Sequence, residues 1–364
     1  MPELKNEVFG FAYRRCTRCV MPSTWSGIAF NSEGVCNICY EYDRQEKINW
    51  EERQKQLSYI LDVYKVRART KGNKWDCVVG LSGGKDSVYT LWAAKKKYSL
   101  SPLAVTFDHG IPMSADAEYN LQRIPALLDV DHLRFSIGRG LRNALCKHTS
   151  QIAGDWCYFC HTGVGSFPAR VSKMFDIPLA LWGEPTSLYQ TTGNDYSVLN
   201  PEEQDKDHFM RCFACGMTPL EMCPSGYEVR DLLPMTWPEG EFELKHLYLG
   251  NFEKWNQKEH VDIITRELGW KHIPTRVSYF DWDKCDCVEG EELRDVQKFH
   301  RRRLSRVAFE CSKEIREGNM TRDEAMKIVE EYEAKIPDLD VSWIVNELGF
   351  KTKEELLNMT NTQI

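Results

Sequence analysis

The chain has 364 residues, of which 42% are hydrophobic and 28% charged, and its formal net charge is −7. This composition is ordinary for a globular protein of one or two domains, and the acidic balance disfavours nucleic acid as a partner, because phosphate contacts need a basic surface. No apolar run approaches the roughly 20 residues that span a bilayer, and the N-terminus lacks the apolar core of a secretion signal, so we expect a cytoplasmic protein without a membrane partner.

Two C-x-x-C pairs near the N-terminus predict a structural metal site. Cys16 and Cys19 are followed by Cys36 and Cys39, a spacing typical of zinc-binding modules. Four thiolates close a tetrahedral zinc shell and leave no open position for catalysis. In a reducing compartment metal ligation is a better explanation for such cysteines than disulfides. We therefore expect a zinc-ribbon module over residues 1–50.

A charged segment with apolar residues at helical spacing follows, including Leu57, Ile60 and Leu61. This spacing predicts a linking helix over residues 51–73. Residues 74–245 are expected to form an α/β domain with an insert at about 185–245. Residues 246–364 are expected to form a mostly helical C-terminal region.

A glycine-rich turn follows the first predicted strand of the α/β domain. The apolar run Trp75–Leu81 predicts a buried strand, Val88–Tyr98 predicts a helix, and Ser-Gly-Gly-Lys-Asp-Ser lies between them at Ser82–Ser87. Unpaired backbone N–H groups and the helix dipole favour an anion at such a turn, and Lys85 adds a positive charge. The turn is therefore expected to hold a nucleotide phosphate.

The spacing of this turn excludes two common nucleotide motifs. A Walker A loop needs a hydroxyl residue after its lysine, whereas Asp86 follows Lys85 here, and the G-x-G-x-x-G fingerprint is absent. The hexapeptide instead resembles the PP-loop of the ATP pyrophosphatase superfamily. That resemblance implies cleavage of ATP between the α- and β-phosphates. The alternative is an ordinary Ser/Gly turn that caps a helix.

Three further segments predict strands that alternate with helices: Ser101–Asp108, Asp131–Ile137 and Ile177–Trp182, with a helix from Ser114 to Leu128. This alternation is typical of an α/β fold in which a parallel sheet has helices on both faces. Ligands bind such sheets at the carboxyl ends of the strands.

The carboxyl ends of these strands carry further candidate site residues. Thr106, Phe107 and Asp108 end the second strand, and Glu184 follows the fourth. Asp108 is expected near the nucleotide, or else caps a helix. Glu184 is expected near the reacting group, or else forms a salt bridge at the rim.

A second set of cysteines lies in the α/β domain and its insert: Cys157, Cys160, Cys212 and Cys215, with Cys223, Cys285 and Cys287 as further candidates. Four thiolates would hold zinc, and three with an open position would hold an iron–sulfur cluster. The alternative is a group of unrelated reduced thiols.

The C-terminal third is predicted to be helical. Phe252–Leu268 is amphipathic and ends at Gly269, Glu291–Glu317 is expected to form one long helix, and Thr321 with Glu324 has the pattern of a capping box. On that long helix Arg302, Arg303 and Arg306 would share a face. Such a face is either solvated or binds a substrate phosphate or a partner.

Five stretches occur in order along most of the chain: Arg15–Pro22, Ser82–Ser87, Val105–Asp108, Trp182–Glu184 and Glu314–Ala325. In combination they resemble the bacterial N-acetyl sugar amidotransferase family of surface-polysaccharide and nonulosonic-acid biosynthesis. The resemblance implies an ATP-dependent ligase that converts an acetamido group on a sugar into an acetamidino group. The amide oxygen would attack the α-phosphorus of ATP, pyrophosphate would leave, and ammonia would then displace AMP.

The resemblance also implies roles for the residues of the turn. Lys85, Asp86 and Glu184 would be catalytic, with Lys85 neutralising charge on the phosphates and Asp86 holding Mg²⁺ or bracing the loop. ATP would be bound by two groups of residues: Ser82, Gly83, Gly84, Lys85, Asp86 and Ser87, and then Thr106, Phe107 and Asp108.

Partners and rival functions follow from the same features. Pro2 stands where an N-terminal glutaminase would need cysteine, and no G-x-C-x-G elbow occurs, so we expect a separate glutaminase to supply ammonia. The substrate is expected to be an N-acetyl sugar, free or nucleotide-linked. The rivals are a PP-loop tRNA-modifying enzyme, either a thiolase or a lysidine-type ligase, and a zinc-stapled nucleotide sensor without catalysis.

Overall fold

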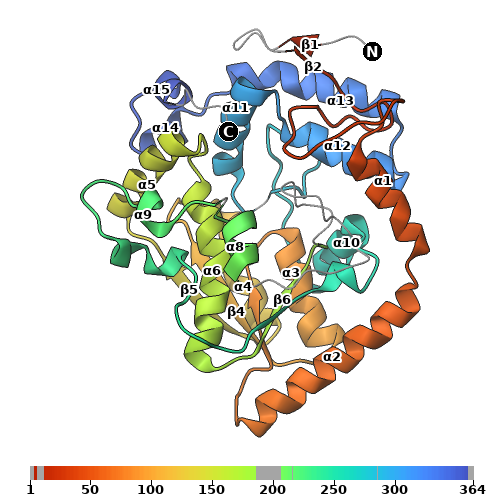
Figure 1. Ribbon diagram of the computed structural model, residues 1–364, viewed down its shortest axis with the longest axis vertical. Coiled ribbons are helices and arrows are strands. Elements are labelled where there is room, and N and C mark those ends of the chain that lie inside the picture. The colour runs from red at the N-terminus through yellow and green to blue at the C-terminus, as the bar shows by residue number, and fades with distance from the viewer. Residues whose placement is uncertain (1–3, 6–11, 186–205, 215, 285, 360–364) are drawn as a thin grey trace.

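The computed structural model describes residues 4–5, 12–185, 206–214, 216–284 and 286–359. Figure 1 shows a central sheet wrapped by helices, with the N-terminal segment lying against the C-terminal helices. No helix within these ranges is long and apolar enough to cross a membrane.

The central sheet has five strands in the order β5-β4-β3-β6-β7. Their bounds are β3 Cys77–Gly80, β4 Pro102–Asp108, β5 Asp131–Ser136, β6 Leu179–Trp182 and β7 Lys245–Tyr248. Every neighbouring pair is parallel. The predicted parallel α/β sheet is confirmed, and β7 extends it by one strand that the sequence pattern did not indicate.

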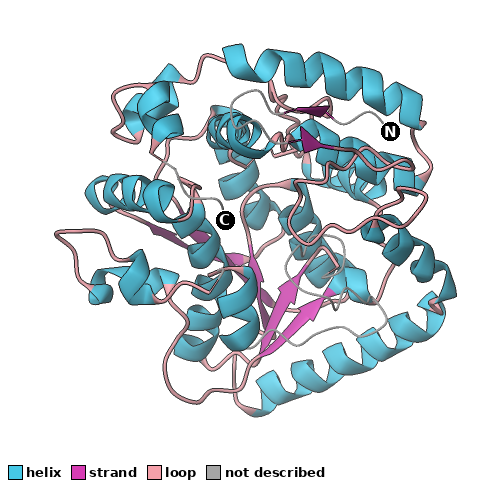
Figure 2. Ribbon diagram, turned by 45° about the horizontal axis from the view of Figure 1, so that its top comes forward, coloured by secondary structure: helices cyan, strands magenta, loops and turns pink. Residues whose placement is uncertain are grey.

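Alternate residues of the strands contribute to two separate cores. On one face Val78 and Ala180 pack with residues of α5 (Arg139–Ile152) and α6 (Tyr158–Phe175). On the other face Val79 and Leu181 pack with residues of four helices. Those helices are α2 (Trp50–Thr70), α3 (Lys85–Trp92), α4 (Ala115–Leu127) and α10 (Gln257–Leu268). Because both faces are covered, the strands need the nearly continuous apolar runs seen in the sequence; Figure 2 shows the strands between their helices.

The remaining helices lie in the N-terminal part, the insert and the C-terminal region: α1 Asn37–Arg44, α8 Lys206–Cys212, α9 Pro219–Met222, α11 Val288–Arg302, α12 Arg306–Glu317, α13 Arg322–Lys335, α14 Ser342–Glu347 and α15 Lys353–Asn358. Shorter turns of helix are η1 Gln45–Lys47, η3 Val229–Met235, η4 Leu249–Asn251 and η5 Ile336–Asp338, and a π-helical stretch, η2 Ala93–Lys97, prolongs α3. Two short strands, β1 Leu4–Lys5 and β2 Ala12–Tyr13, pair antiparallel.

Several predicted helix boundaries are confirmed. Helix α2 covers most of the segment predicted as a linking helix, and α10 ends before Gly269 as predicted, where the backbone is left-handed with a φ of 63°. The predicted start of this helix at Phe252 is wrong, because α10 begins at Gln257 with Asn256 as its N-cap. Thr321 and Glu324 form the predicted capping box, in which the Thr321 N–H donates to Glu324 at 2.9 Å and the Glu324 N–H donates to the Thr321 hydroxyl at 3.3 Å. Local sequence signals decide these ends, because caps satisfy backbone groups within one turn.

The prediction of a single helix over Glu291–Glu317 is wrong. Helix α11 ends at Arg302, and the backbone at Arg303 is left-handed with a φ of 52°. Ser305 then caps α12, because its hydroxyl accepts a hydrogen bond from the Ala308 N–H at 3.3 Å. The buried Asp295 carboxylate also accepts from the Arg306 N–H at 2.8 Å, which stabilises the start of α12.

The break also overturns the shared basic face. Arg302 and Arg306 lie on different helices, and Arg306 is turned inward into an ion pair with the buried Asp283 at 2.7 Å. The Arg301 guanidinium donates to the Gly154 carbonyl at 2.8 Å. These arginines therefore hold elements together within the fold.

The N-terminal module packs against the C-terminal helices α12 and α13. Trp25 stacks on Phe309 with ring centroids 5.0 Å apart, and the Val20 N–H donates to Ser312 at 3.3 Å. Arg15 forms a buried ion pair with Glu333 of α13 at 2.7 Å. The two ends of the sequence thus form one layer, at the top of Figure 1.

Candidate active site and metal centre

The strand order creates a crevice at the carboxyl ends of β3 and β6. The chain runs from β3 outward to β4 and β5, then returns to the other side of β3 to form β6. The loops after β3 and β6 therefore lead away in opposite directions, which is where ligands bind in open α/β sheets. Ser82–Ser87 follows β3 and Glu184 follows β6, so both lie at this crevice.

The Ser82–Ser87 loop is held in shape by its own side chains. The Ser82 N–H donates to the Ser87 hydroxyl at 3.1 Å, the Gly84 N–H donates to the Ser82 hydroxyl at 3.3 Å, and the Ser87 hydroxyl donates to the Gly84 carbonyl at 2.9 Å. Gly83 has a φ of 86°, and a Cβ there would lie 3.3 Å from the Leu121 nitrogen. Only glycine suits this conformation and this spacing.

The start of α3 fits the phosphates of a nucleotide. Gly84 is the N-cap of α3 and provides no side-chain cap, so the first N–H groups of the helix face the crevice without a capping side chain. Trp270 fixes the loop from the other side, with its indole N–H donating to the Gly83 carbonyl at 2.9 Å.

Lys85, Asp86 and Glu184 are brought together beside this loop. Lys85 is only 5% exposed and pairs with Asp86 at 2.9 Å. Burial alone would lower the pKa of Lys85, but the carboxylates of Asp86, Glu310 and Asp283 raise it overall. Burial would likewise raise the pKa of Asp86, and the Lys85 ammonium holds it below its usual range. Lys85 and Asp86 are therefore both charged.

Glu184 differs from its neighbours because it retains a proton at neutral pH. Burial raises the pKa of Glu184 to about 8, and the adjacent Asp86 carboxylate, to which Glu184 is hydrogen bonded, adds to this effect. Gln257 donates to Glu184 at 3.4 Å, and the Trp255 indole N–H donates to Asp86 at 3.3 Å. The crevice thus holds one charged and one proton-carrying carboxyl group side by side.

The three predicted residues at the end of β4 have partners within the fold. The Thr106 hydroxyl donates to the Leu81 carbonyl at 2.6 Å, and the Phe107 ring packs in the core near Phe167. Asp108 pairs with Arg134 at 2.8 Å and accepts from the Gly110 N–H at 2.7 Å. These contacts shape the rim next to the loop, and their roles toward a nucleotide remain predictions.

Sequence reasoning missed two buried carboxylates of the C-terminal region that act on Lys85. Glu310 and Asp283 are fully buried and both raise the pKa of Lys85, after Asp86. Arg306 pairs with Glu310 at 2.6 Å, and Lys313 pairs with Glu310 at 3.1 Å. The available signal was the run of charges at positions 306, 310 and 313, which share a helix face in an otherwise apolar segment.

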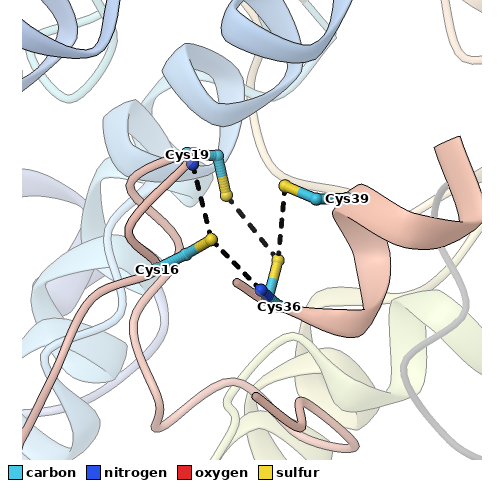
Figure 3. A group of neighbouring side chains, drawn as sticks. All are labelled: Cys16, Cys19, Cys36 and Cys39. Atoms are coloured by element: carbon cyan, nitrogen blue, oxygen red, sulfur yellow. Dashed lines mark hydrogen bonds between the residues drawn. The ribbon is translucent and has the colours of Figure 1, made fainter. Parts of the chain in front are cut away.

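The structure brings together the four N-terminal cysteines predicted to bind zinc, as Figure 3 shows. The sulfur atoms of Cys16, Cys19, Cys36 and Cys39 all lie within 4.8 Å of one another, and all four residues are buried. The Cys16 sulfur also accepts from the N–H groups of Cys19 at 3.4 Å and Cys36 at 3.2 Å.

The chemistry of this set fits a metal. Hydrogen bonds from Cys19 and the other two thiols lower the pKa of Cys16, whereas the pKa of Cys39 is raised because Cys16 lies beside it. Backbone N–H donors to sulfur favour the thiolate form that a metal needs. The residues thus fit a closed, structural four-thiolate site.

Only part of the second predicted cysteine set can be placed. The Cys212 side chain, Cys215 and Cys285 lie outside what the structure describes. Cys157 precedes α6, and a hydrogen bond from Cys160 lowers its pKa. Burial raises the pKa of Cys287, and the nearby Cys157 adds to the effect. Cys287 thus lies near the Cys157–Cys160 pair, whereas the Cys223 thiol donates to the Tyr227 carbonyl at 3.4 Å.

Comparisons with known proteins bear most directly on the C-terminal region. Residues 275–363 match the family model described as "LPS biosynthesis protein WbpG-like, C-terminal domain". An uncharacterized protein of Methanocaldococcus jannaschii is 30% identical over 118 residues, which is 32% of this chain. The chain spans 40% of the length of that relative.

A solved structure provides a weaker likeness. The U34-tRNA thiolase NcsA from Methanococcus maripaludis, with its [4Fe-4S] cluster, aligns over 94% of this chain and 95% of its own. The identity is 13% and the TM-score 0.36, which is too low to support an argument about the site. The family match covers the region that includes Asp283, Arg306, Glu310 and Lys313. Residues 275–363, hereafter the WbpG-like region, are therefore similar to the C-terminal domain of WbpG-like LPS biosynthesis proteins.

Proposed function

We propose that the protein is an ATP-dependent amidotransferase that converts the acetamido group of an N-acetyl sugar into an acetamidino group during surface-polysaccharide biosynthesis. One observation carries the proposal: the WbpG-like region places buried charges against a loop that resembles a PP-loop. The family match supports the pathway, and the loop supports the use of ATP.

An amide carbon is a poor electrophile, and transfer of AMP to the amide oxygen would create a leaving group. Lys85 and the first N–H groups of α3 would bind the phosphates and offset the charge that develops as pyrophosphate departs. The carboxylate of Asp86 is an oxygen donor of the kind that Mg²⁺ prefers, and Mg²⁺ would offset further phosphate charge.

Glu184 is suited to proton transfer in the second step. When ammonia adds to the activated carbon, its nitrogen must lose a proton before AMP can depart. A carboxyl group with a pKa of about 8 exchanges protons near neutral pH, where general acid–base catalysis is most effective. We assign the acceptance of this proton to the ionised fraction of Glu184, about a tenth at pH 7 for a pKa of about 8; the carboxyl group then returns the proton to solvent, and Asp86 is its hydrogen-bonded partner.

The remaining predictions fit this scheme as proposals. Ammonia would come from a separate glutaminase, and zinc bound by the four N-terminal cysteines would be structural. The Cys157, Cys160, Cys212 and Cys215 set remains a prediction of a second site for zinc or an iron–sulfur cluster.

The test is product analysis by mass spectrometry after incubation of the protein with ATP, Mg²⁺, ammonium and a panel of N-acetyl sugars, free and nucleotide-linked. We expect one sugar in which the amide oxygen is replaced by NH, together with stoichiometric AMP and pyrophosphate. ATP cleavage that is stimulated by tRNA and by none of the sugars would overturn the proposal in favour of a tRNA-modifying enzyme. Absence of pyrophosphate with every substrate would favour a non-catalytic nucleotide sensor.

A further inference from the structure

A segment of the WbpG-like region that precedes α11 lies against the Ser82–Ser87 loop. The Lys85 ammonium lies over the Trp282 ring, 5.3 Å from the ring centroid. A Cβ added at Gly84 would lie 3.2 Å from the carboxyl carbon of Asp286 and 3.3 Å from one of its oxygens. Two side chains of this segment therefore lie directly against two successive residues of the loop.

The position of this segment is fixed on both sides of Asp286. The Asp283 carboxylate is fully buried and accepts two hydrogen bonds from the Arg306 guanidinium, at 2.7 and 2.8 Å. The Cys287 N–H donates to the Lys284 carbonyl at 3.3 Å, immediately before α11 begins. Asp286 is thus held next to the loop by an ion pair to α12 and by the start of α11.

The Asp286 carboxylate differs from the other carboxylates near the loop because it lacks a cationic partner. Asp86 pairs with Lys85 at 2.9 Å, and Asp283 pairs with Arg306 at 2.7 Å. Asp286 forms no ion pair and no hydrogen bond among the residues that the structure describes, so it does not cap α11 either. A carboxylate in this place would repel a phosphate bound at the loop, unless a cation lay between the two.

Asp286 also lines a small cavity between the loop that follows β4 and the start of α11. The polar residues of its lining are His109, Ser114, Asp286, Cys287 and Glu289. The cavity volume is about 10 Å³, the space of about one water molecule, so the cavity fits a single ion better than part of a sugar. Mg²⁺ needs only one or two protein carboxylates, because water and substrate phosphates supply its other ligands.

We propose that Asp286 is a magnesium-binding residue of the nucleotide site, where it holds the Mg²⁺ that accompanies ATP beside the Ser82–Ser87 loop. The two oxygens of Asp86 already have donors, Lys85 at 2.9 Å and the Trp255 indole at 3.3 Å, whereas those of Asp286 have none among the described residues. The WbpG-like region thus makes phosphate binding at the loop depend on a divalent cation. The inference rests on the use of ATP in the proposed function and is independent of the identity of the sugar.

The test measures the affinity for ATP by isothermal titration calorimetry, once with Mg²⁺ and once with EDTA, for the unmodified protein and for Asp286→Asn. This substitution keeps the shape of the side chain and removes its charge. With Mg²⁺ we expect the dissociation constant for ATP to rise by at least about tenfold, the loss typical of one charged contact. With EDTA we expect it not to rise, because the substitution removes a carboxylate that repels phosphate.

Two further variants complete the design. Asp281→Asn removes the same charge from an exposed carboxylate of the same segment, which pairs with His272 at 3.0 Å, and is expected to bind ATP as the unmodified protein does under both conditions. Asp286→Ala has neither a carboxylate nor an amide and is expected to reproduce the effect of Asp286→Asn. Thermal unfolding of each variant without nucleotide shows whether the fold is retained.

Each outcome decides the inference. An equal loss of ATP affinity with Mg²⁺ and with EDTA would make Asp286 a structural support of the loop, and unchanged or higher affinity with Mg²⁺ would show that its carboxylate holds no metal. Either result overturns the inference. If the unmodified protein bound no ATP under either condition, the proposed function and the inference would fail together. If it bound ATP with Mg²⁺ but made no amidino sugar, only the proposed reaction would fail.

Discussion

At the scale of single residues, the crevice separates carboxyl groups into different protonation states. Asp86 stays ionised because Lys85 lies 2.9 Å away, whereas the pKa of Glu184 is raised to about 8 by burial and by Asp86. Pairs of titratable groups whose environments drive their pKa values apart are typical of catalytic sites. Two predictions belong to this scale.

Replacement of Lys85 by alanine is expected to lower the rate of pyrophosphate release by about 100-fold or more, the loss typical of one donor to developing charge. The matched control is Lys96→Ala, because Lys96 is exposed in the π-helical stretch that follows α3. A pyrophosphate assay on both folded variants checks the prediction. Full activity in Lys85→Ala would remove the assignment of this loop.

The second prediction concerns the pH dependence of stability and depends on the proton of Glu184. The pKa of this group is about 8 in the folded protein against 4.5 for a free glutamate, so the unfolded chain releases the proton at lower pH. The folded state therefore loses stability as pH rises from 4.5 through 8. The Glu184→Gln variant does not lose stability in this way as pH rises, and its side-chain amide can still donate a hydrogen bond to Asp86.

We therefore expect the melting temperature of Glu184→Gln to exceed that of the unmodified protein by a margin that grows between pH 5 and pH 8. Differential scanning calorimetry at both pH values measures this margin. A margin that shrinks as pH rises would contradict the raised pKa.

At the scale of elements, α12 connects the metal module to the crevice. One side of the helix packs on the four-cysteine module through Phe309, and another carries Glu310, whose carboxylate raises the pKa of Lys85. Its position is set by its cap, by α13 and by the module. Two predictions test these supports separately.

Loss of the four-thiolate site is expected to weaken nucleotide binding from a distance. Cys36→Ser is expected to bind less metal, to melt at a lower temperature and to have a higher dissociation constant for ATP, because the surface that packs on Phe309 depends on the metal that four thiolates would hold. Metal analysis and calorimetry of the purified variant check all three effects. The control is Cys223→Ser, because the Cys223 thiol donates to the Tyr227 carbonyl; this variant should keep both the metal content and the ATP affinity of the unmodified protein. Unchanged ATP affinity in a metal-free Cys36→Ser protein would show that the module does not support the site.

The cap of α12 is expected to contribute about 1 kcal/mol to the free energy of unfolding. Ser305 accepts from the Ala308 N–H at 3.3 Å and donates to Glu333 at 2.5 Å, and Ser305→Ala loses both bonds. Urea denaturation measures the change. Ser58→Ala, at an exposed position within α2, should change the same quantity by less than about 0.5 kcal/mol; equal effects would show that the cap does not stabilise α12.

At the scale of the whole molecule, residues far apart in sequence meet at the same layer. Arg15 pairs with Glu333, and Trp25 stacks on Phe309, so the N-terminal module and the WbpG-like region support each other above the sheet. A separate glutaminase that supplies ammonia is proposed as a partner of the whole molecule. We expect the isolated protein to turn over with ammonium ions but not with glutamine, and an added glutaminase to restore turnover with glutamine. Turnover of the isolated protein with glutamine would contradict this proposal.

Much of the fold was accessible from the sequence because its signals are local. Strands β3, β4 and β6 were predicted because a sheet covered on both faces needs continuous apolar runs. Strand β7 was missed because Lys245–Tyr248 is four residues long and half polar. The turn between α11 and α12 was missed because the helical spacing of the sequence continues across it. Arginine also rarely adopts the left-handed backbone conformation that Arg303 has here.

The sequence by itself determined the glycine-rich turn at Ser82–Ser87, the four-cysteine cluster and the parallel sheet. Each of these depends on neighbours within a few residues, on a fixed spacing or on a repeated pattern. Only the tertiary structure decided that the buried carboxylate of Glu310 acts on Lys85, more than 220 residues away in the chain. Charges on a helix have no sequence signal for the surface they will face, because that surface exists only after the helix has packed.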